Sequence, residues 1–175
     1  MKTTTSQILV VLRILAWLAV IGYAAAIGAV FISFTISLFN PEAARDLYMG
    51  MDYYELRHSN VGLYTVFILL KIAPTALKGI VWLLVARLLS KIQLAKPFTM
   101  EVAQKFQTIA FVLAAVWAVG MMTGFYAGWV ERWSNGAVLD TQSGGEYLFL
   151  AGLVYVFSQI FKRGVEMQAE GDLTV

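Results

Sequence analysis

The sequence contains no cysteine and only one histidine. Without cysteine, the chain has no disulfide framework, no thiol nucleophile and no thiolate metal ligand. His58 lies near Asp46, Asp52 and Glu55, but the spacing of these residues matches no metal-binding motif. No serine has the sequence context of a nucleophile elbow, so no catalytic triad can be assembled. We therefore predict a protein that is not an enzyme and that uses neither a metal nor another cofactor.

Charged residues are also scarce. They make up 14% of the chain, whereas hydrophobic residues make up 59% and the mean hydropathy is +0.71. Only about half of a typical soluble domain is apolar, so this composition excludes an ordinary soluble protein and indicates the lipid bilayer. The formal net charge of +2 is too small to indicate direct binding to nucleic acid.

Four apolar stretches fill most of the sequence. We expect membrane spans at about 14–38, 65–89, 106–130 and 146–163, since a span needs about 17 to 25 residues. The fourth is the shortest, and it reaches full length if Lys162 and Arg163 snorkel or if Glu146 lies in the interface. The first continues to Leu38, too far for a cleaved signal peptide. These features predict a single all-α domain, an integral membrane four-helix bundle.

The basic residues indicate the orientation of the bundle. One side collects eight of them: Lys2, Arg13, Arg87, Lys91, Lys96, Lys105, Lys162 and Arg163. The other side has three: Arg45, Arg57 and Arg132. We therefore predict that both termini, the loop 90–105 and the tail 164–175 are cytoplasmic, and that loops 39–63 and 131–145 lie outside.

Small residues recur at helical spacing in two of the spans. The third span contains the stripe Gly120, Gly124 and Gly128, and the first contains a stripe that includes Gly22 and Ala26. Small residues on one face let another helix approach closely, which matters in lipid. We expect these two stripes to pack against each other within one chain. The alternative is that one of them forms a homo-oligomer interface.

Two lysines interrupt the second span. Lys71 and Lys78 are seven residues apart, hence on one helix face, with Pro74 between them. Lys71 is expected to reach outward to Glu131 or Glu146, whereas Lys78 is expected near the middle of the membrane, where a cation is costly and by default indicates function. Hydroxyl groups or a water cavity can solvate Lys78, a lipid or small anionic ligand can bind it, or it can line an ion path. The apolar stretches contain no Asp or Glu, which disfavours ion-coupled transport.

The helix ends on the predicted cytoplasmic side also follow from local patterns. Thr99 is a suitable N-cap and Glu101 suits the first turn, so the third helix is predicted to begin near Met100. The fourth helix is predicted to continue past Phe161, with an i,i+4 pair between Lys162 and Glu166 and an end at Gly171.

Two segments, KPFTMEVAQKFQTIA and VFSQIFKRGVEMQAEGDLTV, resemble the DUF2975 family of small bacterial membrane proteins with about four spans. The first segment supplies Pro97, Phe98 and Thr99 of the family pattern. The second segment departs from the pattern at one position, where Gly171 replaces the Asn of the family. The second supplies the closing residues: Phe161, Gly164, Glu166, Glu170, Asp172, Leu173 and Thr174. The resemblance implies a bacterial inner membrane location. Family members are often encoded beside small helix-turn-helix transcription regulators.

The resemblance therefore implies a non-enzymatic regulator or scaffold whose tail docks a soluble partner such as a small helix-turn-helix regulator. Two other uses of the tail stay open: it can fold back so that Glu170 and Asp172 meet Lys91, Lys96 or Lys105, or its apolar end can serve as a signal for proteolysis. The alternative function is a small transporter, a channel, or a lipid- or anion-binding protein that uses Lys78.

Overall fold

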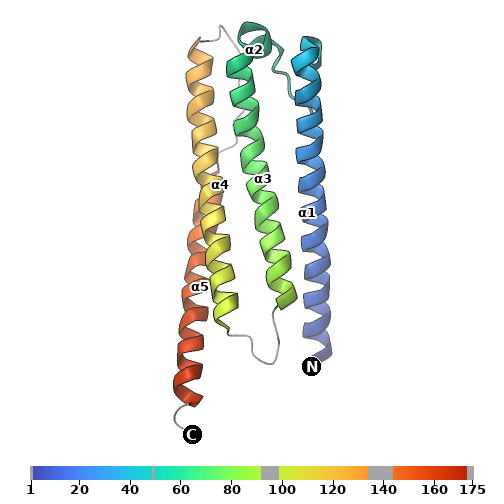
Figure 1. Cartoon of the computed structure of the whole chain (residues 1–175). Coiled ribbons are helices and arrows are strands. Elements are labelled where there is room, and N and C mark those ends of the chain that lie inside the picture. The colour runs from blue at the N-terminus through green and yellow to red at the C-terminus, as the bar shows by residue number, and fades with distance from the viewer. Residues whose placement is uncertain (1, 49, 92–98, 134–143, 173–175) are drawn as a thin grey trace.

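The computed structural model contains six helices and describes residues 2–48, 50–91, 99–133 and 144–172 (Figure 1). The helices are α1 (Lys2–Phe39), the short 3-10 helix η1 (Pro41–Arg45), α2 (Tyr54–Ser59), α3 (Val61–Lys91), α4 (Met100–Trp133) and α5 (Gly145–Asp172). Four of them, α1, α3, α4 and α5, are long and apolar enough to cross a membrane. Each predicted span lies within one of these helices. The protein is all-α, and its four apolar helices make it a multi-pass membrane protein.

The long helices pack in the order of the chain. Within the described residues, α1 contacts α3, α3 contacts α4, and α4 contacts α5, while α1 touches neither α4 nor α5. Both ends of the described chain, at Lys2 and Asp172, lie at the same end of the bundle, called here the terminal end (Figure 1). Helices η1 and α2 cover the opposite end, the capped end. The bundle is therefore an ordered row of helices whose first and last members do not close on each other.

This order corrects the predicted packing of the small-residue stripes. Because α3 lies between α1 and α4, the stripe with Gly22 and the stripe with Gly120, Gly124 and Gly128 do not meet within the chain. A Cβ atom added at any of these glycines would find nothing within 4 Å, so no other helix approaches them closely. Large side chains and hydrogen bonds between helices decide the packing instead. An interface between copies of the chain stays a prediction.

The loop predicted at 39–63 folds into a compact cap. Asn60 Oδ1 accepts hydrogen bonds from the amides of Gly62 (2.9 Å) and Leu63 (3.1 Å) and so caps the start of α3. Arg57 donates to the carbonyl oxygens of Ser37 and Leu38 at the end of α1, where a cation is favourable. Beneath these contacts lies one buried apolar cluster: Phe34, Ala44, Leu47, Tyr53, Leu56, Tyr64, Phe67, Ile68, Ala127 and Val130. The cap thereby ties α1, α3 and α4 together.

The terminal end confirms the predicted start of α4. The helix begins at Met100, and the Val102 amide donates to Thr99 Oγ1 over 3.3 Å. Glu101 in the first turn pairs with Lys91 of α3 and, at 3.9 Å, with Lys105. These two lysines thus have a partner in α4.

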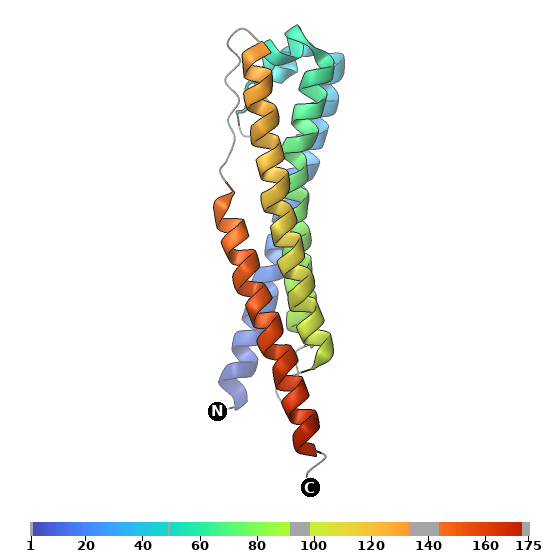
Figure 2. The ribbon, with the colours of Figure 1, turned by 90° about the vertical axis from the view of Figure 1, so that its left-hand side faces the viewer.

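Helix α5 is displaced toward the terminal end (Figure 2). The ring of Phe161 lies 5.0 Å from that of Phe106 near the start of α4, and the ring of Tyr155 lies 6.3 Å from that of Phe111. With the two helices antiparallel, Gly145 lies beside the middle of α4, and the last part of α5 extends beyond the bundle. The short apolar stretch of α5 thus covers only the half of α4 nearer the terminal end.

The end of α5 differs from the sequence-based expectation in two ways, and a third feature bears on one of the open uses of the tail. The helix continues through Gly171 to Asp172, because a glycine does not by itself stop a helix. Glu166 pairs with Arg163 at 3.3 Å, one position away from the predicted Lys162. The described part of α5 is a single helix that does not fold back under the bundle (Figure 2). Leu173 and Thr174 lie outside the described residues.

Candidate functional site

A break in the backbone hydrogen bonding of α3 lies at the centre of the candidate site. Pro74 has no N–H, so the carbonyl oxygen of Leu70 lacks its helical donor. The hydroxyl of Thr123 on α4 lies 3.0 Å from this oxygen and 2.8 Å from the carbonyl oxygen of Val119. The single proton of this hydroxyl is shared between the two oxygens, so a side chain of α4 can donate to the acceptor that proline leaves open in α3 and join the two helices at this level.

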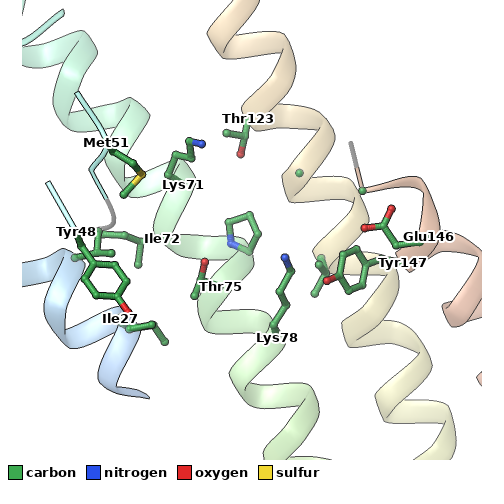
Figure 3. A pocket seen from close by; sticks show the side chains of 16 residues that line it. Ile27, Tyr48, Met51, Lys71, Ile72, Thr75, Lys78, Thr123, Glu146 and Tyr147 are labelled. Atoms are coloured by element: carbon green, nitrogen blue, oxygen red, sulfur yellow. The ribbon is translucent and has the colours of Figure 1, made fainter. Parts of the chain in front are cut away.

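A cavity of about 270 Å³ opens beside this contact (Figure 3). Helix α3 contributes Lys71, Thr75 and Lys78, and the first turn of α5 contributes Glu146 and Tyr147. Apolar side chains of α1, α3, α4 and the capped end make up most of the remaining wall: Ala26, Ile27, Val30, Met51, Ile72 and Val116. Most of the lining is apolar, and the charged groups come from α3 and α5.

The two small-residue stripes reach this cavity from opposite sides. Ala26 of α1 and Gly120 of α4 both line it, although their helices do not touch. The small side chains leave space between α1 and α4 where the sequence predicted contact. The cavity thus occupies the volume that the predicted packing would have filled.

Lys78 is the most unusual group in the cavity. Its Nζ lies 4.8 Å from the centroid of the Tyr147 ring, a cation–π contact. At 1.5 Å per residue, Lys78 is about 26 Å from the start of α3 and about 20 Å from its end, so it lies near the middle of an apolar helix. In the part of the chain that the structure describes, no carboxylate forms an ion pair with Lys78. Its depth in the membrane stays a prediction.

Lys71 and Glu146 lie in the same cavity. Lys71 Nζ is 5.9 Å from the centroid of the Phe67 ring, and the side chain extends toward Thr123 in Figure 3. One of the two ways to complete the fourth span placed Glu146 in the membrane interface, and in the structure it lines the cavity together with both lysines. The short fourth apolar stretch is the sequence feature that indicates this position of Glu146. The cavity therefore combines two amines with one carboxylate.

The residues of the predicted docking tail lie far from the cavity. Phe161 packs on Phe106 inside the chain, whereas Gly164, Glu166 and Glu170 belong to the part of α5 near and beyond the end of the bundle. Met167 between them is 61% exposed. Asp172 is the last residue of α5. Among the described residues, no three of His, Asp and Glu gather closely enough to hold a metal ion.

Comparison with known proteins adds one relationship. A family model described as "Protein of unknown function (DUF2975)" matches residues 48–175. The matched part includes both lysines of the cavity and both segments on which the resemblance rested. No curated protein and no solved structure matches the chain.

Proposed function

The chain belongs to the DUF2975 family, whose function is not known, and on this premise we propose that it is a non-enzymatic membrane regulator. In this role the cavity binds a ligand, and the protruding end of α5 binds a soluble partner. Ligand binding changes the position or stability of α5, and this change is read outside the membrane.

The proposal rests mainly on where α5 begins and ends in the bundle. One continuous helix of about 40 Å, at 1.5 Å per residue, begins with Glu146 and Tyr147 in the cavity and ends at Asp172 beyond the bundle. In the described chain the backbone of α5 packs closely on α4 alone among the long helices, and the contact of Tyr147 with Lys78 links it to α3. A shift of α5 along α4 changes this contact and leaves the close packing of α1 on α3 and of α3 on α4 in place. A ligand that binds one position of α5 more tightly shifts the population toward it.

The proposed orientation places the protruding end in the cytoplasm. Basic residues of the described chain gather toward the terminal end: Arg13, Arg87, Lys91, Lys105, Lys162 and Arg163. The capped end has fewer, and acidic residues such as Glu42 and Asp52 accompany them. Positive charge favours the cytoplasmic side. Together with the family resemblance, this distribution supports a bacterial inner membrane location and a cytoplasmic partner, for which a small helix-turn-helix regulator is our proposal.

The first experiment compares tagged full-length protein with a version that ends at Gly164, both purified from native membranes. The proposal expects a small DNA-binding protein to co-purify with the full-length chain and to be lost from the truncated one. The matched control is Lys162→Met, which removes a charge of α5 but keeps the protruding end. A partner that follows both chains equally contradicts the role of the tail, and so does the absence of any partner from both.

A second candidate, an anion transporter, is favoured by the two lysines and one carboxylate of the cavity. Against it stands the position of the cavity between two buried apolar clusters. Ile72 and Met51 pack on the cluster at the capped end, and Tyr147 packs on the cluster around Leu88 and Leu113. This arrangement favours binding over passage. Anion flux into vesicles that contain the protein, abolished by Lys78→Leu, would support transport and contradict a purely regulatory role.

A further inference from the structure

The charge of Lys78 favours an anionic group. Its ammonium group lies in the cavity lining with Lys71 and Glu146, and none of the ion pairs of the described residues includes it. In Figure 3 the ring of Tyr147 lies between the Lys78 amine and Glu146. An ammonium group at this depth is costly unless an opposite charge or a polar group compensates it. An anion near Lys78 supplies that compensation, and lysine is a common point-charge ligand of phosphate.

The walls of the cavity favour a ligand with hydrocarbon as well as charge. Ile27 and Val30 of α1 and Val116 of α4 contribute apolar surface to the same lining as the lysines. A small hydrated ion would leave this surface without a partner. A ligand that carries both a charged group and an apolar body matches both parts of the lining, as is usual in binding pockets.

Helices α1 and α5 both line the cavity, and in the described residues their backbones do not come close to each other. Large apolar side chains on α1 face outward near this level, including Phe31 at 58% and Ile32 at 61% exposure. In a bilayer such side chains meet lipid. Hydrocarbon chains of a bound molecule can therefore extend between α1 and α5 into the membrane.

From these three observations we infer that the cavity binds the phosphate group of an anionic membrane lipid, with Lys78 as its main cationic contact. Lys71 adds charge at the capped side, and the acyl chains leave between α1 and α5. This inference rests on the proposed ligand-binding role of the cavity and names its ligand. Phosphate chemistry is shared by lipid headgroups and free phosphate, and the apolar lining, together with the separation of α1 from α5, assigns it to the lipid.

Native mass spectrometry of the full-length protein in detergent tests the inference, with phosphatidylglycerol and phosphatidylcholine added at equal concentration. The wild type should retain phosphatidylglycerol, whose headgroup is anionic, in preference to phosphatidylcholine. Lys78→Met should weaken retention about tenfold or more, because a charged hydrogen bond is lost. Lys78→Arg should keep the preference because it keeps the positive charge.

The matched control is Lys162→Met, which removes one exposed lysine of α5 outside the cavity. If Lys162→Met weakens retention as much as Lys78→Met, the effect is general surface charge and the inference is overturned. It is also overturned if the wild type shows no preference for the anionic lipid. Inorganic phosphate that displaces the lipid at equal concentration would assign the site to the free ion and overturn the lipid assignment.

The same preparations separate this inference from the regulatory proposal. Retention of the anionic lipid with no partner bound to the tail contradicts the proposed function and leaves the ligand assignment standing. If a partner binds the tail but Lys78→Met leaves lipid retention unchanged, the ligand assignment is contradicted and the proposed function still stands.

Discussion

The hydroxyl oxygen of Thr123 lies 3.0 Å from the carbonyl oxygen of Leu70, the acceptor that has no helical donor because residue 74 is proline. This contact joins α4 to α3 directly beside the cavity. It places the charged face of α3 at a fixed height against α4. The position of Lys71 and Lys78 therefore depends on a polar contact between two apolar helices.

Replacing Thr123 with valine should destabilise the protein by about 1 kcal/mol, because one hydrogen bond is lost and a buried carbonyl is left without its donor. Thr123→Ser keeps the hydroxyl and should cost less. Unfolding in detergent measures both. In a Pro74→Ala background the backbone N–H returns, so the cost of Thr123→Val should shrink. An equal cost in both backgrounds would contradict the role of this contact.

Ser37 and Tyr64 form the corresponding contact between α1 and α3. Their hydroxyl oxygens are 2.6 Å apart, and both side chains are fully buried. Ser37→Ala and Tyr64→Phe should each destabilise the protein by about 1–2 kcal/mol, because each leaves a buried hydroxyl with a lost partner. The double variant should cost less than the sum of the two. Additive losses in unfolding measurements would show that the hydroxyls act independently.

Lys78→Met should raise the thermal stability of the ligand-free protein, because it removes a cation from an apolar helix. The gain should stay below about 2.5 kcal/mol, the cost of a lysine at the centre of a bilayer helix. The variant should also lose any stabilisation by an anionic lipid, since a ligand stabilises only the state that binds it. A lower melting temperature without ligand would indicate that Lys78 has a structural role.

Truncation after Gly164 should leave stability within about 0.5 kcal/mol of the full chain, because exposed residues and a surface ion pair contribute little. The pair formed by Arg163 and Glu166 is of this kind. By contrast, Phe161→Ala should cost about 2 kcal/mol, because the half-buried ring packs on Phe106. If the truncation is as damaging as Phe161→Ala, the end of α5 is a structural brace.

The absence of native cysteine makes the orientation testable with single cysteine substitutions. In whole cells, a membrane-impermeant thiol reagent should label Glu42→Cys at the capped end and should not label Met167→Cys until the membrane is opened. Both positions are exposed, so accessibility in the folded chain does not limit the reaction. The opposite labelling pattern would mean that the termini face outward.

The local features of this fold could be predicted from the sequence. Thr99 and Met100 define a helix start through backbone capping, which depends on neighbouring residues alone. The position of Lys78 near the middle of α3 likewise follows from its distance to the ends of an apolar stretch. In both cases the physical cause lies within one segment of the chain.

The features that depend on packing between distant segments could not be predicted. The displacement of α5 is set by contacts such as Phe161 with Phe106, and it brings Glu146 into one cavity with Lys78, whereas only a pairing with Lys71 was expected. The choice of α3 as the partner of α1 is set by Ser37, Tyr64, the cap and the close approach of Tyr23 to Gly79 rather than by the predicted stripes. Helical spacing identifies a face of a helix but not the helix that it meets.

The packing of each long helix on its neighbours in the chain has a consequence for how the protein is made. The buried cluster at the capped end draws on α1, η1, α3, α4 and the segment between η1 and α3, and it contains no residue of α5. It can therefore form while α5 is still being synthesised, since domains and their parts fold in the order in which they emerge. Mostly local contacts of this kind also favour fast folding. The helix that completes the cavity is the last to arrive.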